Sequence, residues 1–344
     1  MSTEQAQPLP PYPLHPSIEA RLDPTYKEFY NTHIQNVQQV HHQPISVSRG
    51  SGILIPGGGS KLPVGSTVDY SVPRVETLGP EIKVRVFTPD EKEEARPADG
   101  WPVMVYFHGG GWVLGNIETE NTVCSHLCSR GRCVVVSVDY RLAPEDPYPA
   151  AVHDCWEALL WVFDKSTVSQ LVLNPGKAAV GGSSAGGNLA AIMCHKALAS
   201  STIPRFLAQL LIVPVTDNTA TGQTQASWAE NEHTPALPAA KMLWYRKHYL
   251  PDVKTWGEPE ASPLLYAAGE AWEQQPPALV VVGELDVLRS EGEAYASKLR
   301  EHGISVDLKI MKGMPHPFLA MDAALQQGRD TITFMCEALK KAFV

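Results

Sequence analysis

The chain has 344 residues, of which 44% are hydrophobic and 19% charged, so it is long enough to bury a sizeable core. Its formal net charge of −9 at pH 7 disfavours nucleic-acid binding and polybasic attachment to membranes, both of which use a basic face. No run approaches the roughly 18 apolar residues that a membrane span needs, so we expect neither a nucleic-acid nor a membrane partner.

The N-terminus has neither the basic nor the apolar region of a secretory signal. The six cysteines form no C-x-x-C pair. These two features favour reduced thiols and a cytoplasmic location.

The first third of the chain begins without strand patterns. Residues 1–16 are proline-rich, residues 17–42 have a helical pattern broken near Pro24, and residues 51–66 form a glycine- and proline-rich linker. His41 and His42 are adjacent, but no carboxylate cluster accompanies them. We therefore expect no metal site in this region.

Strand and helix patterns alternate from residue 67 onward. Alternating runs at 68–72 and 82–87 indicate a hairpin at a sheet edge. Later strands are expected at 103–107, 133–138, 178–180, 210–213, 278–282 and 306–310, and helices at 148–165, 186–199, 287–302 and 323–342. Most of these strand runs are continuously apolar, which is typical of strands covered on both faces. The alternation predicts an α/β fold with a mostly parallel sheet.

One interval is too long for a single crossover. About 65 residues separate the strand near 213 from the strand near 278, far above the usual length of a connection. They are rich in aromatic residues and have a helical pattern at 239–249. We expect this insertion to form, with residues 17–42, a lid over the ends of the strands.

Two glycine-rich motifs follow predicted strands. Gly182-Ser183-Ser184-Ala185-Gly186 fits G-x-S-x-G between a strand and a helix, the arrangement that exposes a nucleophilic serine. By itself this motif is equally compatible with a small-residue turn that caps a helix. His108-Gly109-Gly110-Gly111-Trp112 follows the strand at 103–107, and its glycines leave backbone N–H groups unshielded. Acyl transfer needs such donors where negative charge develops on oxygen.

These motifs, together with Asp139-Tyr140-Arg141-Leu142-Ala143-Pro144-Glu145, resemble the hormone-sensitive-lipase-like family of α/β-hydrolases from about residue 70 to the C-terminus. The resemblance implies an α/β-hydrolase core with a helical cap. The divisions that we expect are 1–50 for an N-terminal part of the cap, 51–215 for the first part of the core, 216–255 for the cap insertion and 256–344 for the second part of the core. The chain departs from the family at Ser183, where Asp or Thr is frequent, and in its acid motif, which begins Asp286-Val287-Leu288.

The order Ser184, Asp286, His316 is that of an α/β-hydrolase triad. His316 lies in a proline-flanked loop after the last strand, where the family also places its histidine. Asp286 follows the strand at 278–282, and Asp217 and Glu284 are its rivals as the acid. Three other histidines, His153, His195 and His248, have helical surroundings and suit packing or surface positions.

Further roles follow from this assignment. We expect the N–H groups of Gly110, Gly111 and Ala185 to hold the oxyanion, with Gly109 and His108 shaping the loop. Trp112 lines the acyl pocket or belongs to the core. Arg141 and Glu145 are expected to pair and to hold their loop beneath the site.

The sequence therefore predicts a serine carboxylesterase that acts on short- to medium-chain esters without a metal or organic cofactor, as a monomer or homodimer. The same triad serves an amidase, a lactonase or a deacetylase of a secondary metabolite, and these alternatives stay open. A non-catalytic small-molecule receptor, known among relatives that have lost a triad residue, is less favoured because all three candidates are present.

Overall fold

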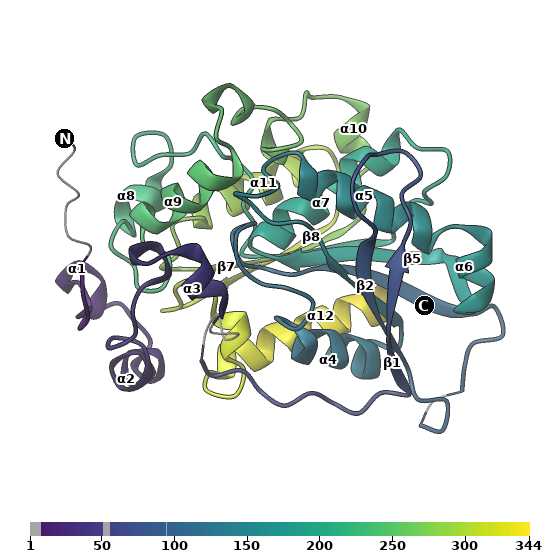
Figure 1. Ribbon diagram of the computed structural model, residues 1–344, viewed down its shortest axis with the longest axis horizontal. Coiled ribbons are helices and arrows are strands. Elements are labelled where there is room, and N and C mark those ends of the chain that lie inside the picture. Colours follow the sequence, from purple (N-terminus) through teal and green to yellow (C-terminus); the bar gives the residue numbers. More distant parts are fainter. Residues whose placement is uncertain (1–7, 51–55, 94) are drawn as a thin grey trace.

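The computed structural model describes residues 8–50, 56–93 and 95–344, and these contain one sheet of eight strands (Figure 1). The strand order is β1-β2-β4-β3-β5-β6-β7-β8. β2 is antiparallel to both of its neighbours, and every pair from β4 to β8 is parallel. The strands are β1 (Ser66–Val72), β2 (Ile82–Thr88), β3 (Trp101–Phe107), β4 (Val134–Asp139), β5 (Leu173–Ser183), β6 (Ala208–Ile212), β7 (Ala278–Gly283) and β8 (Val306–Met311).

Helices cover both faces of this sheet. In Figure 1, α4 and α12 lie on one side of it and α5, α7 and α11 on the other. The α-helices are α1 (Pro16–Glu19), α2 (Pro24–His33), α3 (Ile45–Gly50), α4 (Asn121–Gly131), α5 (Ala150–Val162), α6 (Lys165–Gln170), α7 (Ala185–Leu198), α8 (Ala226–Glu230), α9 (Ala239–Tyr249), α10 (Glu270–Glu273), α11 (Arg289–Glu301) and α12 (Gln326–Ala342). Short 3₁₀ turns are η1 (Val40–His42), η2 (Val253–Thr255), η3 (Pro263–Leu265) and η4 (Phe318–Met321).

The central strands are apolar throughout because each face of the sheet has its own core. Along β3, Val103, Val105 and Phe107 pack into the core beside α5 and α7, whereas Met104 and Tyr106 pack into the core beside α4 and α12. Side chains alternate between faces along a strand, so a strand covered on both sides loses its polar positions. The apolar runs in the sequence thus come from strands covered on both faces. The predicted α/β fold with a mostly parallel sheet is confirmed.

The predicted strands and the helices from residue 148 onward agree with the observed ones, with differences at their ends, whereas α4 was not predicted and the helical pattern over 17–42 was too long, because α2 ends at His33. The helical pattern over 17–42 breaks at Pro24 as expected, because Pro24 begins α2 and the Asp23 carboxylate accepts from the Thr25 N–H at 2.8 Å. β5 is longer than the predicted 178–180. The first part of the predicted linker, residues 51–55, lies outside the described residues.

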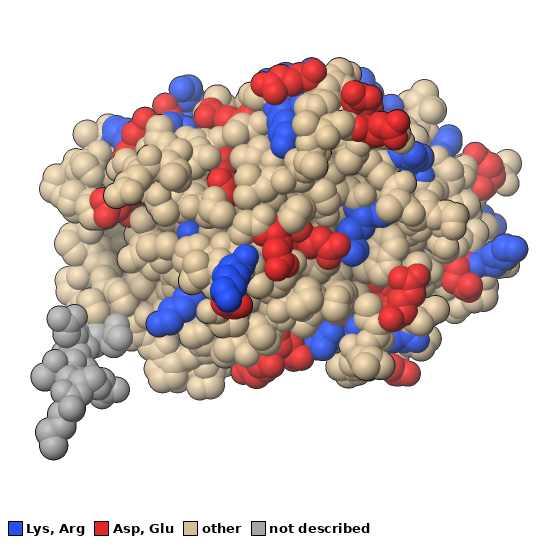
Figure 2. All heavy atoms as spheres, turned by 90° about the horizontal axis from the view of Figure 1, so that it is seen from above, with Lys and Arg blue, Asp and Glu red and all other residues tan. Residues whose placement is uncertain are grey.

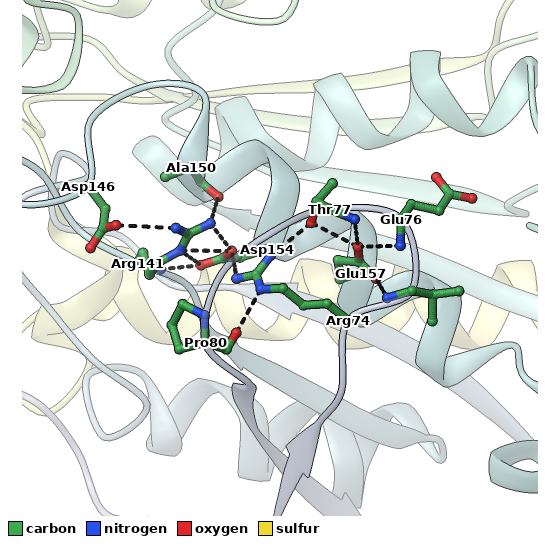
Figure 3. Close-up of polar contacts among 10 residues, drawn as sticks. Arg74, Glu76, Thr77, Pro80, Arg141, Asp146, Ala150, Asp154 and Glu157 are labelled. Carbon is green, nitrogen blue, oxygen red and sulfur yellow. Dashed lines mark hydrogen bonds and ion pairs between the residues drawn. The ribbon is translucent and has the colours of Figure 1, made fainter.

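The loop after β4 is held by a pairing that the sequence analysis assigned wrongly. Arg141 does not pair with Glu145: it contacts Asp146 and, at 2.8 Å from Nη2 to Oδ1, the buried Asp154 of α5 (Figure 3). Glu145 pairs instead with Arg49 of α3, 96 residues away in the chain. Residue spacing cannot distinguish these partners, because the choice depends on which helix packs beside the loop.

Asp154 is shared by two cations. Arg74, in the loop between β1 and β2, forms a second ion pair with its carboxylate, and the side chains of Arg74 and Asp154 are 6% and 1% exposed. Next to it, Glu157 accepts hydrogen bonds from the backbone N–H groups of Val75 and Glu76 at 2.8 and 2.9 Å (Figure 3). Two carboxylates of one helix therefore fix two loops of the sheet edge.

The surface carries mixed charge on the face seen in Figure 2, where acidic and basic side chains are interspersed without a continuous basic patch. Within the described ranges, no helix combines the length and the apolar character needed to cross a membrane.

The shared carboxylate predicts a large loss of stability in Asp154→Asn. The amide leaves the buried Arg74 without its charged partner and leaves Arg141 with Asp146 alone, and we expect the free energy of unfolding to fall by about 3–5 kcal/mol. Urea unfolding followed by circular dichroism measures it. Asp146→Asn is the matched control, because Asp146 contacts the same Arg141 from a side chain that is 41% exposed, and its effect should stay below about 1 kcal/mol. Equal losses in the two variants would contradict this account.

Candidate active site

Ser184 lies on a tight turn between β5 and α7. Its φ and ψ angles are 55° and −116°, a positive φ that non-glycine residues rarely adopt, and its N–H donates to the Ile212 carbonyl at 2.8 Å. Gly182 and Gly186 flank the turn, and a Cβ added to either would collide with the carbonyl oxygen of Phe107 at the end of β3. The turn is therefore possible only with glycine at both positions.

The predicted base and acid are in contact. Nδ1 of His316 donates to Oδ2 of Asp286 at 2.8 Å, and both side chains are buried. Asp286 follows β7 and also accepts from the N–H of Leu288 at 3.0 Å through Oδ1. His316 lies in the loop after β8, where the sequence analysis placed it.

The rival acids have other partners. Oδ1 of Asp217 accepts from the N–H and the hydroxyl of Thr219 at 2.8 and 2.6 Å, within its own loop. Glu284 pairs with Lys312 at 3.1 Å and accepts from the N–H of Gly313. Of the three candidate acids, Asp286 is the one that forms a hydrogen bond with His316.

The glycine loop after β3 faces the same turn. Gly110 and Gly111 have positive φ angles of 125° and 63°, and within the described part of the chain their N–H groups donate to no protein acceptor. Ala185 is the first residue of α7, where N–H groups have no partner inside the helix. The three donors expected to hold an oxyanion therefore belong to adjacent segments, and two of them are unpaired among the described residues.

His108 shapes this loop from below. Its Nδ1 donates to the Gly109 carbonyl at 2.7 Å, and its ring stacks on Tyr140 with centroids 4.3 Å apart. The Tyr140 hydroxyl donates to the His108 carbonyl at 2.7 Å. Burial lowers the pKa of His108 to about 4, so the ring is neutral at physiological pH.

A cavity of about 680 Å³ contains Ser184, His316 and the glycine loop. Residues from two distant parts of the chain line it as well: Tyr26, Ile34 and Val37 from the N-terminal segment, and Leu237, Lys241, Met242 and Tyr245 from the region of α9. Trp112 lines the cavity and also stacks on Tyr249, with ring centroids 4.3 Å apart, so it belongs both to the cavity wall and to the core.

Sequence reasoning missed Glu120, which lies beneath the glycine loop. Its Oε1 accepts from the hydroxyl of Ser183 at 2.5 Å and from the N–H of Gly109 at 3.4 Å. Burial raises the pKa of this carboxyl above its ordinary value, although the hydrogen bond from Ser183 acts in the opposite direction. Glu120 thus connects Ser183, the residue before Ser184, to Gly109, the first glycine of the loop. Ser183 is one of the positions at which the chain departs from the family, and Glu120 is its hydrogen-bond partner.

The chain is similar in sequence to known α/β-hydrolases. Residues 104–320 match a protein family described by the alpha/beta hydrolase fold. The chain is 47% identical over 336 residues to an AB hydrolase superfamily protein from Schizosaccharomyces pombe, covering 96% of this chain and 97% of the relative. It is 35% identical to a carboxylesterase from Mycobacterium tuberculosis over 263 residues, covering 76% and 79% of the two chains.

Among solved structures, a hyperthermophilic esterase from the archaeon Pyrobaculum calidifontis is similar over 93% of this chain and 98% of its own, with a TM-score of 0.82 and 32% identity. The likeness thus extends well beyond the residues that carry the motifs.

The close approach of α7 to β3 predicts that Gly186→Ala is poorly tolerated. The new methyl group meets the backbone carbonyls of Phe107 and His108, so the helix must move away from the strand, at a loss of about 1–3 kcal/mol in unfolding free energy. Chemical denaturation measures the loss. Gly187→Ala is the control on the same helix. A Cβ atom at this position would lie 3.1 Å from its nearest neighbours, in Pro214, so a much smaller shift accommodates it. A Gly186→Ala variant as stable as the wild type would show that the two elements can separate freely.

Proposed function

The chain belongs to the family of α/β-hydrolases, and from this premise we propose that it is a serine carboxylesterase whose nucleophile, base and acid are Ser184, His316 and Asp286. The contact between His316 and Asp286 in the cavity that contains Ser184 is the observation that carries the assignment. The three residues follow the ends of three parallel strands of one sheet, which supports this assignment.

In the first half-reaction the Ser184 hydroxyl attacks the ester carbonyl carbon. His316 accepts the hydroxyl proton and then gives it to the departing alcohol, so that the C–O bond breaks and an acyl-serine remains. Asp286 fixes the tautomer of His316 through Nδ1 and stabilises the imidazolium that forms. Water then repeats the sequence on the acyl-serine and releases the acid. Because serine and histidine supply the nucleophile and the proton transfers, this reaction needs no cofactor.

Negative charge develops on the carbonyl oxygen in both half-reactions. The N–H groups of Gly110, Gly111 and Ala185 are the proposed donors to it, and preorganised donors of this kind contribute about 3 kcal/mol each. Gly109 is not among the donors in this proposal, since its N–H points to Glu120, and it forms the turn that presents the next two glycines.

The cavity favours substrates of limited size. Its volume of about 680 Å³ is in the range of sites that enclose most of a small ligand, which supports short- to medium-chain acyl groups in esters dissolved in water. We assign the covering role of a cap to the segments 1–50 and 216–255, because described residues of both line the cavity. In Figure 1, α2, α3, α8 and α9 of these segments lie together at the left end of the sheet. Trp112 belongs to the proposed substrate-binding wall.

The proposal predicts hydrolysis of p-nitrophenyl esters that is strongest for short acyl chains and falls toward palmitate. Release of p-nitrophenol from an acetate-to-palmitate series, by the wild type and Ser184→Ala in parallel, measures it. The alanine variant should lose turnover by several orders of magnitude while its thermal unfolding stays close to that of the wild type, because one small buried hydroxyl is removed. Undiminished turnover in Ser184→Ala would remove Ser184 as the nucleophile. Turnover confined to amides or lactones would favour one of the alternative reactions.

The acid is tested by comparing Asp286→Asn with Asp217→Asn. An asparagine at 286 cannot hold His316 in the required tautomer, and kcat for a p-nitrophenyl ester should fall by about 10⁴, as in other serine triads. Asp217 caps its own loop through Thr219, so its variant should have a far smaller effect on kcat. Steady-state kinetics at saturating ester give both values. A greater loss in Asp217→Asn would mean that the acid has been misassigned.

A further inference from the structure

One lysine lines the cavity that contains Ser184 and His316. Lys241 comes from the first turn of α9, and among the described lining residues it is the one Lys or Arg. Met242 and Tyr245 of the same helix also line the cavity, and the Tyr245 ring lies directly over Gly111. The ammonium group therefore belongs to the helix that covers the proposed oxyanion donors.

The Lys241 ammonium has one hydrogen-bond partner where it can have three. Nζ donates to the Ala236 carbonyl at 2.7 Å, and no ion pair to an acidic side chain is formed within the described ranges. The acidic residues that line the same cavity are engaged elsewhere: Glu118 with Arg85 at 2.6 Å, Glu120 with Ser183 at 2.5 Å, and Asp322 with the N–H of Gly59 at 2.8 Å. Among the residues that the structure describes, Lys241 thus has no counter-ion.

The titratable groups that face Lys241 from the N-terminal segment are His41 and His42 of η1, whose rings lie 3.9 Å apart. Burial and the lysine charge lower the pKa of His41 to about 3, and they also lower the pKa of His42. Both rings are therefore neutral at pH 7 and add no charge beside the ammonium. Of the described side chains of α9 and η1 that line this part of the cavity or face it, Lys241 is the one that carries a charge at pH 7.

An unpaired cation beside an apolar wall is costly unless an anion joins it. Burial lowers the pKa of Lys241 only to about 8, so the amine is still mostly charged at pH 7. Stability alone would favour a methionine or leucine at this position, since most of the surrounding lining is apolar. The retained charge fits a site whose missing partner enters with the substrate.

We infer that the Lys241 ammonium binds a carboxylate carried by the ester substrate, so that the preferred substrates are esters with a free carboxylate, such as half-esters of dicarboxylic acids. The inference rests on the proposed esterase function and specifies its substrate class. Lys241 does not touch the reacting carbonyl in this proposal. Its contact exists in the bound ester and in the transition state alike, so its effect belongs to KM more than to kcat.

Two substrate pairs test the inference, each matched in length. Mono-p-nitrophenyl adipate against p-nitrophenyl hexanoate places the carboxylate on the acyl side, and 6-acetoxyhexanoate against hexyl acetate places it on the alcohol side. In at least one pair, the wild type should favour the carboxylate ester, and Lys241→Met should reduce the ratio of kcat/KM values about tenfold, the effect of one charge-assisted hydrogen bond. Lys247→Met, an exposed lysine on the same helix, should leave both ratios unchanged.

A measurement on the wild type alone covers the case in which Lys241→Met fails to fold. A lysine is charged below its pKa and neutral above it, so the preference for the carboxylate ester should be full at pH 7 and fade as the pH rises through about 8 toward 10. Ratios that do not differ between wild type and Lys241→Met in either pair, or a preference that does not change with pH, would overturn the inference. Failure of the esterase proposal would look different: no hydrolysis of any of the four esters, or equal hydrolysis by Ser184→Ala.

Discussion

The proximity of α7 to the end of β3 is the constraint on which the rest of the site depends. Gly186 brings the helix against the carbonyls of Phe107 and His108, and the positive φ of Ser184 is the backbone consequence of turning from β5 into that helix within one residue. The same contact places the first turn of α7 beside the glycine loop, which begins directly after Phe107. A single steric requirement thus sets the proposed nucleophile and the proposed oxyanion donors relative to one another before any substrate arrives.

Buried hydrogen bonds then fix the parts that sterics leave free. The pair of Asp286 and His316 closes the loops after β7 and β8 onto each other, and the contact of Glu120 with Ser183 and Gly109 does the same for the loop after β3. The bond between Asp286 and His316 spans 30 residues of the chain, and the bond between Glu120 and Ser183 spans 63. Because the groups are shielded from water, losing one partner would leave the other unsatisfied, which makes these contacts more rigid than surface equivalents.

The sequence was most informative where a local constraint, such as burial or lack of space for a Cβ atom, determines the residue type. Apolar runs follow from strands covered on both faces, and the glycines around Ser184 follow from a turn that excludes Cβ atoms, so both could be read without a structure. Pairings between side chains that are distant in the sequence could not be predicted in this way. Arg141 has acidic residues at several spacings, and its partner Asp154 is decided by the packing of α5 against the sheet. Glu120 follows no motif, and its role depends on a serine 63 residues away. The division into cap and core segments remains a prediction from the pattern.

Chemistry and selectivity come from different parts of this chain. The groups proposed to break the ester lie at the ends of β3, β5, β7 and β8, where sheet geometry leaves little room for variation. The wall that an acyl or alcohol chain would touch is built instead from the N-terminal segment and the region of α9, which approach the cavity from outside the sheet. Arg49 ties the first of these segments to the core through the carbonyls of Val113 and Ala143, at 2.8 and 2.7 Å. In the proposed function, a substitution in this wall can therefore alter which ester is accepted without moving the proposed triad. A charged side chain such as Lys241 can lie there without disturbing the reaction proposed for the core.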